Sequence, residues 1–148
     1  GNLTIAMGSD DDQLTISENA VVEAQRRLTI TGDDGIDAVI VEGNLLSANE
    51  DLVLQTDSGN DIVRITGTGY LAAAQGSVSI ELGGGNNKLE LLESGRISAN
   101  TTLMIYGGDV DQLILNGIVR SVTNLTIALG NGDDTITIGQ HADIDSTA

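Results

Sequence analysis

Residues 124–138 read NLTIALGNGDDTITI: an alternating apolar run, a turn rich in glycine and aspartate, and a second alternating run. Strict alternation of apolar and polar residues is typical of a half-buried β-strand, because successive strand side chains point to opposite faces. The same order of elements occurs near the start of the chain, where residues 2–16 read NLTIAMGSDDDQLTI. A strand, a tight turn and a second strand therefore form a unit that is repeated.

The unit recurs six times along the 148 residues with an almost constant spacing. The key positions of the turns are 25, 24, 26, 24 and 23 residues apart, and they are Asp12, Asp37, Asp61, Asn87, Asp111 and Asp134. The leading apolar residues of the preceding runs keep the same phase, at Leu3, Leu28, Leu52, Val78, Leu103 and Leu125. A repeat of about 25 residues without helical periodicity predicts an all-β fold, a right-handed parallel β-solenoid of about six coils.

The competing all-β fold is an antiparallel sandwich, but a sandwich gives no reason for its turns to stay in phase. We expect residues 1–148 to form a single solenoid domain without a cap at either end, because the last coil nearly duplicates the first. Ala148 and Gly1 both fall at the phase of Arg26, so joining two copies places Asp12 26 residues after the preceding Asp134. The matching repeat phase of the two ends predicts one of two partners: another copy of the chain stacked head to tail, or flanking repeats of a longer chain.

The core must be aliphatic, since the chain contains no Phe, no Trp and two Tyr. A third short strand in each coil is indicated by an apolar residue followed two positions later by a small one. The pairs are Val22 and Ala24, Leu46 and Ala48, Ile97 and Ala99, and Ile144 and Ser146. We expect each pair to face the interior, with the small residue at a tight corner.

The charge balance limits the possible partners. Six Lys and Arg residues against 22 Asp and Glu residues give a formal net charge of −16. This argues against binding to nucleic acid or to an anionic membrane surface, both of which need clustered cations. No segment approaches the roughly 18 apolar residues of a membrane-spanning helix, so we expect no membrane insertion. The absence of Cys excludes disulfides and thiolate metal sites.

Twelve of the acidic residues lie in the six turns, which stack at about 4.8 Å in the predicted fold. Carboxylates in such a column repel one another unless cations lie among them. Oxygen ligands without His or Cys suit Ca²⁺, and suit Mg²⁺ less well because Mg²⁺ requires a stricter octahedral geometry. The alternative needs no metal: Gly, Asp and Asn are also preferred in any tight turn, and stacked side chains can hydrogen-bond to backbone amides of the adjacent coil.

The turns resemble the Ca²⁺-binding nonapeptide G-G-x-G-x-D-x-U-x of RTX proteins. Residues 129–137, LGNGDDTIT, match this motif at Gly130, Gly132, Asp134 and Ile136. The resemblance implies that repeat aspartates donate carboxylate oxygens, and their neighbours carbonyl oxygens, to Ca²⁺ between stacked turns. The candidate ligands are therefore Asp12, Asp37, Asp61, Asp111 and Asp134, with Asn87 as a weakened member and Asp10, Asp34 and Asp109 in the same turns.

The chain departs from that family in several ways. RTX motifs repeat every nine residues, with two turns to a coil, whereas this chain has one such turn per 25 residues. Asp10 and Asp109 stand where the motif has glycine, and the turn before Asp37 reads as if it carried an additional residue. The apolar residues Ile36 and Val110 beside two key acids predict uneven occupancy of the sites.

Similar sequences occur in very large bacterial surface proteins. The expected function is therefore that of a non-enzymatic structural or adhesive module at the cell surface or outside the cell, stiffened by Ca²⁺. A polysaccharide-binding or polysaccharide-active β-helix is the alternative, with surface glycans as partners. An enzyme of that kind needs a base near its acidic ligands, but Arg64, Arg96 and Arg120 fall at different positions in their coils.

Overall fold

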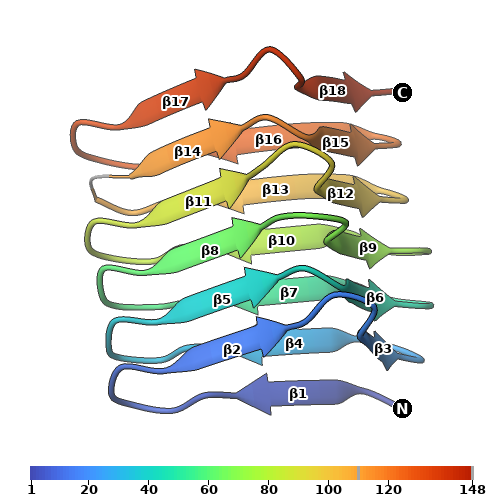
Figure 1. Cartoon of the computed structure of the whole chain (residues 1–148), viewed down its shortest axis with the longest axis horizontal. Coiled ribbons are helices and arrows are strands. Elements are labelled where there is room, and N and C mark those ends of the chain that lie inside the picture. The colour runs from blue at the N-terminus through green and yellow to red at the C-terminus, as the bar shows by residue number, and fades with distance from the viewer. Residues whose placement is uncertain (110, 148) are drawn as a thin grey trace.

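A computed structural model describes residues 1–109 and 111–147, and the expectations that concern Val110 and Ala148 lie outside these residues. The described residues form 18 strands and no helix, arranged as six coils of three strands each. In Figure 1 the chain crosses the near side from left to right and returns on the far side while it rises from the N- to the C-terminus, so the winding is right-handed. The predicted all-β parallel solenoid is confirmed, with about 25 residues per coil.

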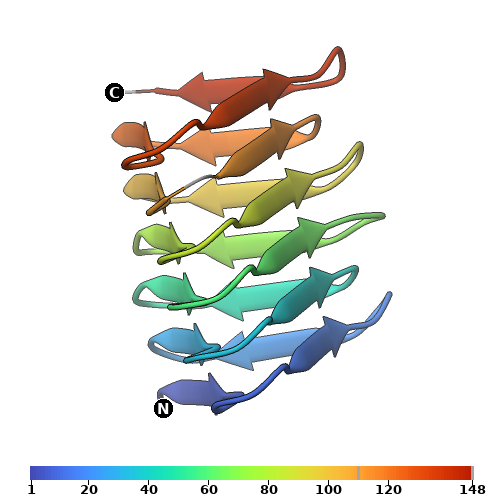
Figure 2. The ribbon, with the colours of Figure 1, turned by 90° about the vertical axis from the view of Figure 1, so that its left-hand side faces the viewer.

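Each coil contributes one strand to each of three parallel sheets, which Figure 2 shows from the side. The first sheet contains β1 (Leu3–Ala6), β4 (Leu28–Thr31), β7 (Leu52–Gln55), β10 (Val78–Glu81), β13 (Thr102–Tyr106) and β16 (Asn124–Ala128). The second contains β2 (Gln13–Ile16), β5 (Ala38–Val41), β8 (Ile62–Ile65), β11 (Lys88–Leu91), β14 (Gln112–Leu115) and β17 (Thr135–Ile138). The third contains β3 (Val21–Ala24), β6 (Asn44–Ser47), β9 (Tyr70–Ala73), β12 (Arg96–Ala99), β15 (Ile118–Ser121) and β18 (Asp143–Ser146).

The core is a set of aliphatic columns that run along the solenoid axis. Parallel in-register pairing places each inward side chain directly on its equivalent in the next coil, as Leu28 lies on Leu52 and Leu52 on Val78. These three side chains are fully buried. Alternation along each strand leaves the intervening residues, such as Thr29 and Val53, on the outer face. Each fully buried aliphatic side chain stabilises the fold by roughly 1.5–3 kcal/mol, which explains how a core without Phe or Trp suffices.

One prediction about the core was wrong. In the second coil Leu45 pairs with Val22, and Ser47 pairs with Ala24, so Leu45 and Ser47 face the interior in place of Leu46 and Ala48. Leu45 and Ser47 are almost completely buried. The cause is the short connection before β6, which has two residues (42–43) where the equivalent connection in the first coil has four (17–20). Two adjacent leucines fit either register, and the length of this corner selects one of them.

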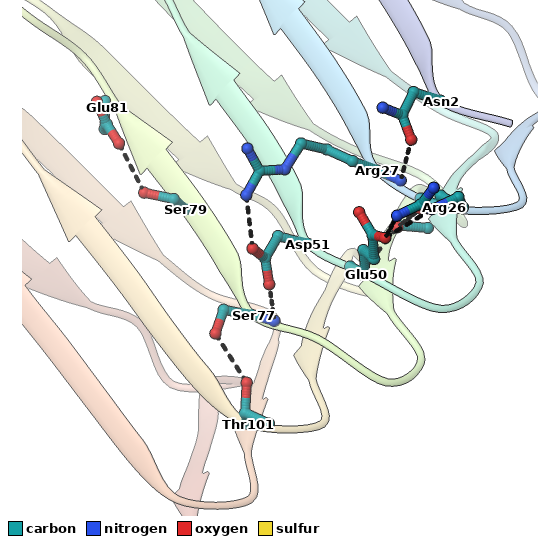
Figure 3. Close-up of polar contacts among 10 residues, drawn as sticks. Asn2, Arg26, Arg27, Glu50, Asp51, Ser77, Ser79, Glu81 and Thr101 are labelled. Atoms are coloured by element: carbon teal, nitrogen blue, oxygen red, sulfur yellow. Dashed lines mark hydrogen bonds and ion pairs between the residues drawn. The ribbon is translucent and has the colours of Figure 1, made fainter.

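Polar side chains cross from coil to coil at the corner between the third and first sheets (Figure 3). The guanidinium of Arg27 donates to Asp51 at 2.9 Å, and the other carboxylate oxygen of Asp51 accepts the backbone N–H of Ser77 at 2.9 Å. The Ser77 bond, followed by the hydrogen bond and charge of Arg27, lowers the pKa of Asp51. Arg26 and Glu50 form a parallel ion pair at 2.6 Å. These contacts therefore join adjacent coils at this corner.

The first and last coils leave parts of their inward faces exposed. Strands β1, β2 and β3 form one edge of the three sheets, and β16, β17 and β18 form the other. In the last coil, Ile136 and Ile138 point inward like their partners Leu113 and Leu115, yet they remain 51% and 64% exposed. The described residues therefore end in two apolar faces with unpaired strand edges.

Candidate metal centre in the glycine- and aspartate-rich turns

The glycine- and aspartate-rich turns connect the first sheet to the second and lie above one another along the left edge of Figure 1. Five of them have six residues, and the turn before Asp111 has five. The additional residue expected before Asp37 does not exist. Asp34 pairs with Ser58, and Ser58 pairs with Gly84, so this turn is in register with the two that follow it.

The six key residues form a continuous column, which we call the inner ladder. In each step the side-chain oxygen of one coil accepts the backbone N–H of the equivalent residue in the preceding coil. The donor-to-acceptor pairs are Asp12 to Asp37 (3.0 Å), Asp37 to Asp61 (2.8 Å), Asp61 to Asn87 (2.9 Å), Asn87 to Asp111 (3.3 Å) and Asp111 to Asp134 (2.9 Å). One oxygen of each acceptor is therefore used in the way that the metal-free alternative predicted.

The second oxygen or nitrogen of each ladder residue decides what else the column can bind. Four members, Asp37, Asp61, Asn87 and Asp111, are at most 2% exposed. Asn87 donates its Nδ2 hydrogen to the carbonyl oxygen of Gly83 at 3.2 Å, and Asp111 accepts the N–H of Gly108 on Oδ2 at 2.8 Å. In contrast, the Oδ2 atoms of Asp37 and Asp61 are buried and have no hydrogen-bond partner among residues 1–109 and 111–147.

Burial affects the ionisation of these two acids. Loss of hydration raises the pKa of Asp37 and of Asp61, and this outweighs the ladder bond that each accepts from the preceding coil. Neighbouring carboxylates raise both pKa values further. The hydroxyl of Thr56 lowers the pKa of Asp61, but it donates its hydrogen to the carbonyl oxygen of Leu82 at 2.9 Å. A buried carboxylate without compensation is unstable as an anion, so this position favours either a proton or a cation.

The unpaired oxygen of Asp37 occupies space that a glycine leaves open. A Cβ atom at Gly32 would lie 2.3 Å from Oδ2 of Asp37 and 3.0 Å from the carbonyl oxygen of Thr56. Carboxylate and carbonyl oxygens therefore face the same space beside Gly32. Sequence reasoning did not identify Gly32 or Thr56, because the first residue of the turn differs from coil to coil and carries no repeated signal.

The other predicted ligands, Asp10, Asp34 and Asp109, are exposed and do not form one column. Asp10 is equivalent to Gly35 of the next coil. The backbone N–H of Asp10 donates to the carbonyl oxygen of Asp34, as the backbone N–H of Gly35 donates to the carbonyl oxygen of Ser58. Asp34 is the preceding residue of its turn and accepts the Ser58 hydroxyl. Asp109 accepts the N–H of Gly85 on Oδ2 at 3.0 Å.

Two glycines of the motif are required by the close approach of adjacent turns. A Cβ atom at Gly59 would lie 1.6 Å from the carbonyl oxygen of Gly35, and one at Gly85 would lie 1.8 Å from that of Gly59. Both distances are far below van der Waals contact, so no other residue fits without a shift of the backbone. These glycines therefore keep the stacked turns, and the inner ladder with them, at strand spacing.

The geometry defines what a metal ion would find here. Among residues 1–109 and 111–147, no three acidic, histidine or cysteine side chains come close enough to bind one ion. An ion at Asp37 and Asp61 would therefore complete its coordination with backbone carbonyl oxygens and water. Such mixed oxygen coordination is what Ca²⁺ accepts, because its geometry is flexible and its ligand number is six to eight.

A second surface feature is a groove of about 490 Å³ on the outer face of the third sheet. It spans five coils, from Glu23 to Val122, and is formed mainly by small side chains of the outward row, with an aromatic ring and polar groups beside them. The residues that define it are Leu46, Tyr70, Ala72, Ser98, Asn100 and Val122.

Within the described ranges, the chain has no helix of the length and apolar character needed to cross a membrane. Comparisons with protein-family models, with curated proteins and with solved structures found no match to this chain.

Proposed function

We propose that this chain is a non-enzymatic structural module of the RTX-like type, in which Ca²⁺ bound between stacked turns stiffens a β-solenoid. The observation that carries the proposal is the pair of buried, unpaired Oδ2 atoms of Asp37 and Asp61 in adjacent coils. A bound cation would compensate both charges, and the ladder bonds on the Oδ1 atoms would hold the carboxylates in place.

The same argument ranks the steps of the inner ladder. Asp37 and Asp61 offer a free oxygen, whereas the second atoms of Asn87 and Asp111 are already engaged within their own turns. The strongest site is therefore between the second and third coils, and the steps that involve Asn87 are weaker because a neutral amide replaces a carboxylate. Asp10, Asp34 and Asp109 are exposed and act as outer charges that attract the ion.

A structural role at the cell surface or in the extracellular space fits the expected affinity. Extracellular Ca²⁺ modules bind at about 0.1–1 mM, a concentration range that is met outside cells. The non-enzymatic part of the proposal is supported by the placement of the basic residues: Arg64 and Arg120 are each paired with a carboxylate, and they lie on different sheets. Most cationic charge is thus used to join coils.

The groove on the third sheet favours a second candidate function, the binding of a surface polysaccharide. Tyr70 provides an aromatic surface for the apolar face of a sugar, and Ser98 and Asn100 provide hydrogen-bonding groups beside it. Replacement of Tyr70 by alanine should then abolish retention of the module in a gel that contains the polysaccharide. Unchanged retention would exclude the groove as the glycan site.

Thermal unfolding with and without Ca²⁺ tests the first proposal. An ion that binds only the folded state adds about 2.7 kcal/mol per site at a hundredfold excess over Kd. After removal of trace metal, the Tm should rise in millimolar Ca²⁺, rise less in the same concentration of Mg²⁺, and return to its starting value in EGTA. Equal Tm values in Ca²⁺ and EGTA would reject the calcium module.

A further inference from the structure

One basic side chain differs from the other five. Those five form ion pairs with carboxylates, and they are Arg26, Arg27, Arg64, Lys88 and Arg120. The sixth, Arg96, is exposed and has no carboxylate within ion-pair distance among residues 1–109 and 111–147. In a chain with 22 acidic residues, this guanidinium is therefore available to an anion from another molecule.

Arg96 lies beside the groove on the third sheet. Arg96 and Ser98 are two positions apart in β12, so their side chains point to the same, outer face. In the adjacent strand β9 (Figure 1), Tyr70 is the partner of Arg96, and Ala72 is the partner of Ser98. Tyr70, Ala72 and Ser98 all line the groove. The third and fourth coils, which hold these four residues, have a neighbouring coil on both sides, so the arrangement belongs to the interior of the solenoid.

The groove runs along the solenoid axis, across the strands. Ala72 faces outward and is nevertheless only 7% exposed, so it lies on the floor. Leu46 in the preceding coil and Ser98 in the following coil continue this floor. Glu23 in the first coil and Val122 in the fifth mark its two ends. A ligand in the groove therefore meets equivalent positions at steps of about 4.8 Å, the distance between paired strands.

This form favours an extended polysaccharide over a peptide. The length of one pyranose unit in an extended β-linked chain is close to the spacing of the coils, so each coil can contact one sugar. The floor is the face of a sheet whose interior strands are paired on both sides, so it offers no free backbone groups to a peptide strand. Tyr70 supplies an aromatic surface, and Ser98 and Asn100 supply polar groups for sugar hydroxyls.

The charges around the groove distinguish between kinds of polysaccharide. Glu23 is the one charged residue that lines the groove, and it lies at the first-coil end, whereas Arg96 lies beside the fourth coil. A guanidinium can bind a carboxylate through two parallel hydrogen bonds. The net charge of −16 repels a polymer that carries a negative charge on every sugar. A uronate between neutral sugars reduces this repulsion and still offers a carboxylate to Arg96.

We propose that the groove binds an extended β-linked polysaccharide whose uronate units are separated by neutral sugars, and that Arg96 binds one uronate carboxylate. This proposal rests on the second candidate function above, the groove as a glycan site, and it is independent of the calcium module. It assigns to Arg96 the choice between acidic and neutral chains, and to Tyr70 the binding of the sugar rings.

Calorimetric titration with a matched pair of ligands tests the role of Arg96. The ligands are hyaluronan oligosaccharides long enough to span the groove, in which uronate alternates with neutral N-acetylglucosamine, and the same oligosaccharides with their carboxylates reduced to alcohols. EGTA is present, so that Ca²⁺ cannot bridge the uronates and the acidic turns. The wild type should bind the native form about two- to fivefold more tightly than the reduced form, as expected of an exposed ion pair. High salt should reduce this difference.

Variants at the groove should separate charge from ring binding. Arg96→Gln should weaken binding of the native form to the level of the reduced form, and Arg96→Lys should keep part of the difference because it keeps the charge. Lys88→Gln makes the same change of charge on the second sheet and should leave both affinities unchanged. Tyr70→Ala should abolish binding of both forms. If Tyr70→Ala melts far below the wild type, Ser98→Leu, which fills the floor, takes its place.

The possible failures are distinguishable. Equal affinity for the native and reduced forms, lost in Tyr70→Ala, would overturn the role of Arg96 and leave the groove as a glycan site. No binding of either form would overturn both. A glutamate-rich peptide that binds as tightly as the native oligosaccharide would assign the groove to acidic peptides and overturn the proposal.

Discussion

Replacement of Asp61 by asparagine should stabilise the metal-free protein and weaken its response to Ca²⁺. The Asp61 side chain is fully buried, and its Oδ2 atom has no donor among residues 1–109 and 111–147. Asn87 shows how an amide behaves at the equivalent position of the next coil. Its Oδ1 keeps the ladder bond at 2.9 Å, and its Nδ2 donates to Gly83 at 3.2 Å.

The size of the effect follows from the free-energy cost of burying the unpaired Oδ2 atom, which the substitution removes. A buried polar group without a partner costs about 1–3 kcal/mol, and more when it is charged. Asp61→Asn should therefore raise the free energy of unfolding in EGTA at neutral pH by about 1–3 kcal/mol. In a chain of this size each kcal/mol moves the Tm by about 2–4 °C. In Ca²⁺ the variant loses a ligand charge, so its gain from the metal should be smaller than that of the wild type.

Two further variants make this experiment specific. Asp61→Ala removes the acceptor of the Asp37 N–H, a bond of 2.8 Å, and should destabilise the protein with or without Ca²⁺. Asp133→Asn makes the same change of charge at an exposed position of the last turn and should change stability by less than about 0.5 kcal/mol. Calorimetric or fluorescence-based melts in EGTA and in Ca²⁺ provide the measurement. If Asp61→Asn destabilises the metal-free protein as much as Asp61→Ala does, the reasoning about the unpaired oxygen is wrong.

Three other outcomes are expected. In metal-free buffer, the free energy of unfolding measured by urea denaturation should rise as the pH falls from 7 through the raised pKa values of Asp37 and Asp61. The reason is that the folded state binds these two protons more tightly than the unfolded state does. The rise should vanish in the variant with asparagine at both positions. Gly59→Ala should destabilise far more than Gly67→Ala, since its Cβ atom would overlap a backbone carbonyl whereas the Cβ at residue 67 meets nothing within 4 Å, and a comparison of the two Tm values checks this. Asn87→Asp should raise Ca²⁺ affinity in a calorimetric titration and lower stability in EGTA, and an unchanged titration would place the metal elsewhere.

The repeat made most of the fold predictable from the sequence. Two landmarks in phase, the leading apolar residues and the key acids, identify the coil length, the inward columns and the side of the solenoid on which the turns stack. The register of the third strand in the second coil was not predictable, because Leu45 and Leu46 fit the interior equally well. The deciding factor is the connection at residues 42–43, which has two residues where the first, third, fourth and sixth coils have four, and a single sequence does not reveal this difference.

The candidate site was predictable as a column of residues but not in its atomic detail. The spacing of the repeats identified Asp37 and Asp61 as members of one column. The preference of Asp and Asn for tight turns also predicted side-chain hydrogen bonds to backbone amides of the adjacent coil, and the inner ladder contains such bonds. Which of the second oxygen atoms lacks a partner depends on neighbours such as Gly32, Thr56 and Gly108. These residues occupy positions without a repeated pattern, so their effect becomes apparent only when the turns are stacked in space.

Every strand in the interior of a sheet pairs with its equivalents in the two adjacent coils. The free energy of unfolding should therefore divide into a contribution from each coil and a contribution from each neighbouring pair, as in a one-dimensional lattice. Amide hydrogen exchange should be slowest in the third and fourth coils and progressively faster toward both ends. A terminal coil pairs with one neighbouring coil, whereas an internal coil pairs with two, so a terminal coil opens at a lower cost in free energy. A whole coil is thus the smallest segment that evolution, or an engineer, can add or delete without disturbing the register of the others.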